Sequence, residues 1–318
     1  PGAGTTPFDH EVKVALGYTL ARDACDGRPP HIWTFNLQDE TSALYAAAGM
    51  MTHGCIANID VRENTIPNMT YAAAYDLGNR VSPYFHRTKP LRWAAVHYSE
   101  LAKDKYELDG PACWRRVLFP VYGAYLALFR AHLPVGIITD SQLEEGLLDG
   151  YRVLFVPAPD DLTDSMRQVV EDFEAGGGVV IRQREDWLWH DPEGLDAAAE
   201  AFIGALGDEP DEAPVQASGG PVNMHVDNFL SPDGNRLTVS LANEFTWLHT
   251  GRNPPAPEDL PTPPPNCEGV SVDIRERGAP ARVFDAVTGN ELEFEAIAGG
   301  VRVALPTFSY MAVVVAEF

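Results

Sequence analysis

The chain has 318 residues, with 23 lysines and arginines against 46 aspartates and glutamates, and a formal net charge of −23. A hydrophobic fraction of 45% and an aromatic fraction of 10% are typical of a globular chain with a substantial core, which excludes a disordered tail or a coiled coil. DNA and anionic membranes both bind cationic surfaces, so the acidic balance argues against either partner. At about 100–200 residues per domain, we expect two or three domains.

The four cysteines, Cys25, Cys55, Cys113 and Cys267, are far apart and form no CxxC motif or zinc-ligand spacing. This usage favours a reducing compartment and argues against a structural metal. The apolar stretches are too short or too interrupted to span a bilayer, and no basic segment followed by an apolar one opens the chain. We expect a cytoplasmic protein without a metal, a cofactor, a nucleic-acid partner or a membrane partner.

Residues 1–90 alternate between helical and strand patterns. We expect helices from about residue 10 to 24, from 41 to 51 and from 69 to 85, and strands at 31–37 and 55–61. Polar residues gather at the carboxyl end of both strands, as they do in (β/α)8 barrels, whose sites lie on the loops after the strands. Two strands cannot close a barrel. This region is therefore predicted to be the end of a (β/α)8 barrel that does not fold alone.

Residues 91–207 repeat the alternation of strands and helices. The patterns predict strands at 93–98, 135–139, 152–157 and 179–183, and helices at 111–132, 143–148, 163–175 and 197–206. Short connections between alternating elements predict a parallel, doubly wound sheet. The α/β class of the whole chain rests on this domain and on the barrel end.

Residues 208–318 change to an alternation of period two, which is typical of antiparallel strands. Seven strands are expected, at 222–226, 236–243, 269–275, 281–285, 292–296, 300–305 and 309–317. They predict a carboxyl-terminal antiparallel β-sandwich. Residues 251–265, with seven prolines, form an insertion that is expected to be stiff and extended.

The doubly wound domain suggests a flavodoxin-like or amidotransferase-like fold. Class I amidotransferases place a cysteine nucleophile at the turn after a strand, where a helix amino terminus lowers the pKa of the thiol. Here the third predicted strand is followed by Pro157 and Ala158, and Cys113 lies before a different helix. Thiol hydrolysis in this domain is therefore disfavoured. The glycines at 176–178 precede a strand and are predicted to end a helix, not to bind a nucleotide.

Three segments carry a resemblance to a known family. Residues 153–181, VLFVPAPDDLTDSMRQVVEDFEAGGGVVI, resemble the trimerisation domain of family 42 glycoside hydrolases, which are β-galactosidases with a TIM barrel. Residues 46–62, AAAGMMTHGCIANIDVR, are similar to the last barrel helix and strand of that family. Residues 281–296, ARVFDAVTGNELEFEA, and 299–315, GGVRVALPTFSYMAVVV, are similar to its closing β domain.

This resemblance implies three domains: a barrel end at 1–90, a catalytically inactive amidotransferase-like domain at 91–207 and a β-sandwich at 208–318. It implies part of a glycosidase that cleaves O-glycosidic bonds in oligosaccharides or glycosides. It also implies a carbohydrate substrate, and either a homo-oligomer or a complementary chain that supplies the other barrel strands. The alternative is a non-catalytic module for oligomerisation or carbohydrate binding.

The candidate site residues follow the two predicted barrel strands. Asp39, Glu40 and Asp60 are the candidate catalytic residues, and Trp33, Asn36, Asn58 and Arg62 are the candidate substrate-binding residues. In the family, the acid/base glutamate lies on a strand absent from this chain, and the nucleophile ends the penultimate strand, which corresponds to residues 33–40. Each assignment has a competing structural interpretation. Asp39 and Glu40 could be acids that stabilise a helix amino terminus. Asn58, Asp60 and Arg62 could form an ion-paired strand end, and Trp33 could belong to the barrel core.

Overall fold

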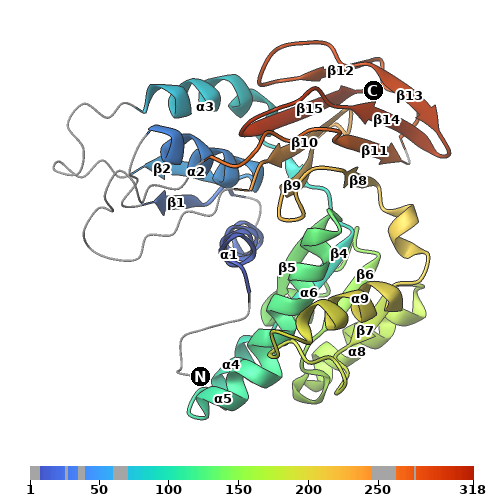
Figure 1. The fold of residues 1–318 in the computed structure, drawn as a ribbon. Helices are drawn as coiled ribbons and strands as arrows, with labels where there is room; N and C mark the ends of the chain where they lie inside the picture. Colours follow the sequence, from blue (N-terminus) through green and yellow to red (C-terminus); the bar gives the residue numbers. More distant parts are fainter. Residues whose placement is uncertain (1–7, 26–27, 35–39, 60–70, 245–262, 276) are drawn as a thin grey trace. The chain divides into compact units, whose positions relative to one another are not determined.

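The computed structural model describes residues 8–25, 28–34, 40–59, 71–244, 263–275 and 277–318 (Figure 1). The chain divides into two compact units. The parallel-sheet unit comprises Pro1–Ala24 and Arg92–Ala213, and the sandwich unit comprises Cys25–Leu91 and Pro214–Phe318. Residues 1–90, expected as one domain, are divided between these units. The three-domain division stays a prediction.

The parallel-sheet unit is built on four strands in the order β5-β4-β6-β7, and all neighbouring strands are parallel. The strands are β4 (Ala94–Tyr98), β5 (Val135–Thr139), β6 (Val153–Val156) and β7 (Val179–Arg182). Each lies where the sequence pattern predicts a strand, because these short, largely apolar runs fit a sheet that is covered on both faces.

Helices cover the two faces of this sheet. One core contains α1 (His10–Ala24), α6 (Phe119–Arg130) and α9 (Leu195–Ala205), packed on residues such as Val96 and Phe155. The other core packs α7 (Asp140–Glu144) and α8 (Asp164–Ala175) on the alternate residues of the same strands. Shorter elements complete the unit, namely α4 (Glu100–Tyr106), α5 (Gly110–Cys113), the π-helix η1 (Trp114–Leu118) and the 3₁₀ turns η2 (Pro159–Asp161) and η3 (Glu209–Glu212).

Helix α1 belongs to the parallel-sheet unit, although the sequence places it with the barrel strands. The Asp23 carboxylate accepts a hydrogen bond of 2.8 Å from the backbone N–H of Ile137, on β5, and is paired with Arg22. The Thr19 and Tyr125 hydroxyls lie 2.8 Å apart. The Asp23 carboxylate thus satisfies a backbone N–H of β5, which lies at the end of the sheet order.

Two predicted helices differ from the structure. The helix expected at 111–132 is divided into α5, η1 and α6, which run on without a gap. The helix expected at 143–148 instead begins at Asp140 and ends at Glu144. Thr139 explains the earlier start, because its side chain accepts from the backbone N–H of Gln142 and the Gln142 side chain accepts from that of Thr139, which is a capping box.

The sandwich unit contains two antiparallel sheets, in the orders β12-β15-β10-β9-β3 and β13-β14-β11-β8. Their bounds are β3 (Lys89–Pro90), β8 (Val215–Ser218), β9 (His225–Leu230), β10 (Arg236–Ala242), β11 (Ser271–Arg275), β12 (Arg282–Asp285), β13 (Phe294–Ile297), β14 (Gly300–Ala304) and β15 (Met311–Glu317). The strand expected at 222–226 begins at His225 and runs to Leu230. Most of the proline-rich insertion lies outside the described residues.

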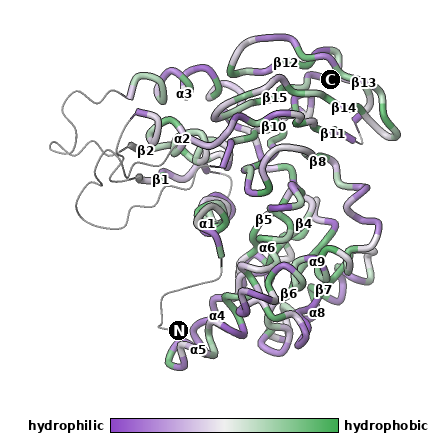
Figure 2. Tube along the Cα trace, viewed as in Figure 1, coloured by the Kyte–Doolittle hydropathy of each residue, from purple (hydrophilic) through white to green (hydrophobic). Residues whose placement is uncertain are grey.

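The five-stranded sheet is buried on both faces. Val314, on β15, belongs to the core between the two sheets, whereas Val313 and Val315 contact the core formed with α2 (Glu40–Thr52) and α3 (Ala72–Phe85). Strand β15 is accordingly almost entirely hydrophobic, as Figure 2 shows. Helices α2 and α3 are therefore bound to the sandwich by a hydrophobic core.

Two short strands, β1 (His31–Thr34) and β2 (Ile56–Ile59), form a separate parallel pair in the same unit. Helix α2 connects them, as the sequence predicts for a β-α-β unit. Among the described residues, no helix has both the length and the apolar composition needed to cross a membrane.

Candidate functional site

The β1–β2 pair brings two of the candidate site residues together. The parallel register places Trp33 opposite Asn58, one residue before each strand ends. Because the strands are parallel, their carboxyl ends lie at the same edge of the pair. Helix α2 begins at Glu40, in the segment after β1.

The structure describes three of the seven candidates. Trp33, Glu40 and Asn58 are within the described residues, whereas Asn36, Asp39, Asp60 and Arg62 lie outside them. Glu40 is exposed in the first turn of α2, where a carboxylate also interacts favourably with the helix dipole. Both interpretations of Glu40, catalytic acid and helix-terminal acid, fit this position.

Trp33 is the most informative of the three. Its side chain is 57% exposed, so in this structure the indole is not a core residue. The sequence favours barrel core as the more frequent role of such a tryptophan. An exposed indole beside a polar strand end offers a large apolar face and a hydrogen-bonding N–H, which are the properties of a ligand-stacking residue.

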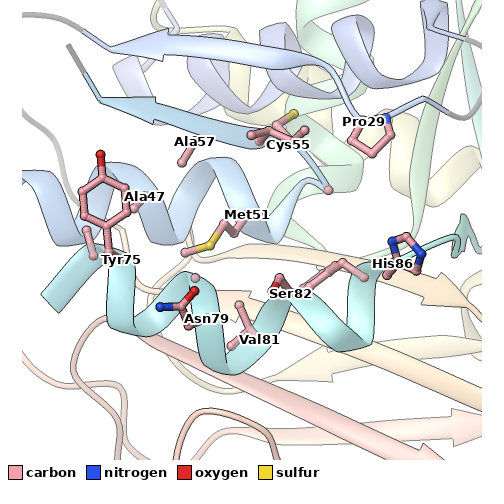
Figure 3. A pocket seen from close by; sticks show the side chains of 15 residues that line it. Pro29, Ala47, Met51, Cys55, Ala57, Tyr75, Asn79, Val81, Ser82 and His86 are labelled. Atoms are coloured by element: carbon pink, nitrogen blue, oxygen red, sulfur yellow. The ribbon is translucent and has the colours of Figure 1, made fainter. Parts of the chain in front are cut away.

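A groove of about 390 Å³ lies beside β2, between α2 and α3 (Figure 3). Its walls are mostly apolar and include Met51 on α2, Ile56 on β2 and Tyr75 on α3. Ile56 and Tyr75 are both exposed, at 42% and 59%. The sheet order gives β2 a single neighbour, β1, among the described residues. The groove thus lies beside a strand that pairs with only one other strand among the described residues.

Sequence reasoning missed a buried polar network in the sandwich unit. His53 follows α2, and its Nδ1 lies 3.2 Å from Oδ2 of Asp227, while its Nε2 lies 2.9 Å from Nδ1 of His225. All three side chains are buried. His225 and Asp227 are two residues apart on β9, so they share one face of the strand. Polar residues at this spacing in an otherwise apolar strand are the signal that could have revealed the network.

A second buried pair lies at the carboxyl ends of β4 and β5. Nε2 of His97 lies 2.8 Å from the Asp140 carboxylate, which also accepts hydrogen bonds from Ser99 and from the backbone N–H of Leu101. Burial works to raise the pKa of Asp140, but these hydrogen bonds outweigh it and hold the pKa below 3.8. The pair connects two neighbouring strand ends and stabilises α4 at its first turn.

Cys113 has the properties of a structural thiol. Its side chain is buried, and burial raises the pKa of the thiol. A protonated thiol is a weak nucleophile. Within the described residues, no group of three or more histidine, cysteine or acidic side chains is arranged to hold a metal ion.

The comparisons with known proteins identify the fold. The sequence matches no protein-family model and no curated protein. The structure is similar to α-L-fucosidase isoenzyme 2 from Paenibacillus thiaminolyticus, with a TM-score of 0.71 and 13% identity over 96% of this chain and 63% of that one. It is also similar to a β-galactosidase from Bacillus circulans sp. alkalophilus, with a TM-score of 0.60 and 11% identity over 100% of this chain and 59% of that one.

A third solved structure extends the same likeness. It is the family 42 β-galactosidase Gan42B from G. stearothermophilus, with a TM-score of 0.52 and 10% identity over 100% of this chain and 58% of that one. The chain thus spans about three fifths of the length of these glycoside hydrolases. The resemblance to family 42 glycoside hydrolases is confirmed at the level of the fold, which is mixed α/β with parallel and antiparallel sheets.

Proposed function

We propose that this chain is part of a glycoside hydrolase that cleaves O-glycosidic bonds, with its barrel completed by sequence outside the chain. The observation that carries the proposal is the register of β1 and β2, which sets the exposed Trp33 beside Asn58 at the strand ends, close in sequence to Glu40. The fold shared with three glycoside hydrolases supports it.

The groove beside β2 supports completion of the barrel. In a (β/α)8 barrel every strand has two parallel neighbours, and helices cover the outside of the strands. A further strand paired with β2 would cover the exposed Ile56, and its helix would cover the exposed Tyr75 on α3. Parallel strands are normally buried on both faces, so an open edge of this kind needs such a cover.

The proposed chemistry assigns roles to the polar cluster at the strand ends. Asp39, Glu40 and Asp60 are the candidates for the catalytic carboxylate of this chain, and the opposing carboxyl comes from the completing strands. The two carboxyls stand about 5–5.5 Å apart in retaining enzymes and about 6.5–9.5 Å apart in inverting ones. Trp33, Asn36, Asn58 and Arg62 contact the sugar.

We assign the parallel-sheet unit to the amidotransferase-like class. Its strands in chain order give the sheet order 2-1-3-4, which is the beginning of the flavodoxin-like arrangement. Without a nucleophile after β6, its role in the proposal is assembly of a homo-oligomer. Among the described residues no disulfide links the four cysteines, and we infer a cytoplasmic location.

The test is hydrolysis of aryl glycosides by the full-length protein. The panel includes nitrophenyl β-D-galactoside and α-L-fucoside, since the similar structures are a fucosidase and β-galactosidases. We expect turnover of at least one substrate. Sugar binding without turnover on a panel of pyranosides and furanosides would instead support the non-catalytic carbohydrate-binding module, and the proposal of an enzyme would be wrong.

A further inference from the structure

The parallel-sheet unit contains a pocket that the proposed reaction does not use. It has a volume of about 420 Å³, within the range of about 300–1,000 Å³ that is usual for small-molecule sites. Residues 157–161, which follow β6, line it together with Tyr106, Arg115 and Arg116. The other lining residues follow β7 and are Gln183, Arg184, Glu185, Trp187, Leu188 and His190. All of these residues belong to one unit.

The position of the pocket in the sheet is the first argument. The chain passes from β4 to β5 on one side and continues through β6 and β7 on the other side of β4. Open parallel sheets bind ligands outside the carboxyl ends of the strands, near the point where the strand order reverses. Pro157 to Asp161 lie directly after β6, which is one of the two strands at this point.

The π-helix is the second argument. In η1, the backbone N–H of Phe119 donates to the carbonyl of Trp114, which is the wider spacing of a π-turn. Such turns are rare and occur frequently at functional sites. This one carries Arg115 and Arg116, both of which line the pocket. The sequence alone predicts an uninterrupted helix here, so the insertion changes the direction of these two side chains.

The pocket has a preorganised wall. The Asp161 carboxylate is paired with Lys105 and accepts a hydrogen bond of 3.3 Å from the Tyr106 hydroxyl. Arg116 lies over the Tyr106 ring, at 5.2 Å from its centroid. On the other side, Oε1 of Gln183 accepts a hydrogen bond of 2.8 Å from the buried Trp189 indole. These contacts fix the rings and the amide before any ligand binds.

The remaining polar groups define the ligand. Within the part of the chain that the structure describes, Arg115, Asp160 and Glu185 make no hydrogen bond or ion pair through their side chains. Arg184 is already paired with Asp186 through two contacts of 3.0 Å. The open groups therefore include both donors and acceptors, with two carboxylates that would repel an anion. A hydroxyl group both donates and accepts, so a neutral polyhydroxylated ligand suits this set.

We propose that this pocket binds a neutral saccharide and gives the parallel-sheet unit its own sugar site, in addition to the candidate site on β1 and β2. The inference rests on the proposed function for the choice of a sugar among polyhydroxylated ligands. Its geometry is independent of β1 and β2, because the described residues that line the pocket all belong to the parallel-sheet unit.

The experiment is hydrogen-exchange mass spectrometry of the full-length protein with D-galactose, L-fucose or inorganic phosphate. Peptides that cover residues 157–161 and 183–190 report on the pocket itself. We expect protection by a sugar, and an affinity that falls about tenfold in Arg115→Ala and in Glu185→Gln, since each loses a hydrogen bond from a charged group. Arg167→Ala, an exposed arginine on α8 outside the pocket, is the matched control and keeps the wild-type affinity.

The outcomes separate the two proposals. Hydrolysis of an aryl glycoside without protection of the pocket peptides by either sugar overturns the second site and leaves the proposed function intact. Protection by phosphate alone shows an anion site and also overturns it. Protection by a sugar that is lost in Arg115→Ala supports the site, even if the protein hydrolyses no glycoside.

Discussion

Nε2 of His53 lies 2.9 Å from Nδ1 of His225, and this contact joins the end of α2 to strand β9 across 172 positions of sequence. Oδ2 of Asp227 lies 3.2 Å from Nδ1, the other ring nitrogen of His53. A carboxylate in this position favours a proton on Nδ1 of His53, which leaves Nε2 to accept from His225 when both imidazoles are neutral. The network thus orients the histidines and fixes the end of α2 on strand β9.

Replacing either histidine is expected to destabilise the sandwich unit. His53→Ala should lower the free energy of unfolding by about 1–3 kcal/mol, because buried polar groups of Asp227 and His225 each lose a partner. A double-mutant cycle with His225→Ala should give a coupling energy of about 0.5–3 kcal/mol in chemical denaturation. Additive effects of the two substitutions would contradict a direct interaction.

Asp140 is expected to make the parallel-sheet unit sensitive to acid. Burial raises the pKa of Asp140, but hydrogen bonds from His97, Leu101 and Ser99 lower it by more than burial raises it. The pKa in the folded protein is therefore below the ordinary 3.8. A depressed carboxyl pKa adds stability above the unfolded pKa and loses it as the pH falls through the folded pKa. The contribution is therefore complete above about pH 5 and decreases below about pH 4.

The measurement is the free energy of unfolding against pH for the wild type and Asp140→Asn. The variant should be less stable near neutral pH, and the difference should shrink as the pH falls below 4, since the wild type then loses the same charge. Asp164→Asn, at an exposed acid on α8, is the control and should change the free energy of unfolding by no more than about 0.5 kcal/mol. A constant difference at all pH values would show that Asp140 acts through packing alone.

Gly123 on α6 is expected to tolerate no side chain. A Cβ at this position would overlap the indole of Trp189, which is fully buried in the same core. Gly123→Ala should therefore lower the free energy of unfolding by about 1–3 kcal/mol, as overpacked cores do. Gly204→Ala is the matched control on α9, because nothing lies within 4 Å of the added carbon and the site is exposed. It should be stabilising by about 0.4–1 kcal/mol.

The sequence predicts the strands of the parallel-sheet unit well, because each is a short buried run with a turn or helix signal on both sides. It does not predict which elements pack together. Strand β15 shows the difficulty: Val313 and Val314 belong to different cores, and a strand buried on both faces loses the alternation that marks a one-sided strand. The partner of such a strand cannot be read from its own sequence.

The candidate site shows the same limit. The polar residues after β1 and β2 are recognisable, and the register that sets Trp33 against Asn58 follows from a parallel β-α-β unit. The network of His53, His225 and Asp227 is not recognisable, because its members are separated by most of the chain and become neighbours only through packing. Glu40 lies at a helix start, where acids are common, so its type and position alone leave its role undecided.

In the proposed glycosidase, the acidic residues that come after β1 and β2 in the sequence are expected to carry the chemistry. Barrel sites are assembled from the loops after the strands. Asp39 and Glu40 come after β1 in the sequence, and Asp60 comes after β2. An amide keeps the size of a carboxylate but cannot act as nucleophile or general base. The three variants are Asp39→Asn, Glu40→Gln and Asp60→Asn. The variant that removes the catalytic carboxylate should lower kcat by at least about a hundredfold.

Stability separates a catalytic from a structural role in this series. Glu40 is exposed, so its amide should change the melting temperature little, because surface substitutions usually alter the free energy of unfolding by no more than about 0.5 kcal/mol. Glu100→Gln is the matched control, since Glu100 is an exposed acid in the first turn of α4, in the other unit. It should keep wild-type turnover. All three amide variants could also keep wild-type turnover of an aryl glycoside that the parent protein cleaves. In that case Asp39, Glu40 and Asp60 have structural roles, and the catalytic carboxylates lie elsewhere.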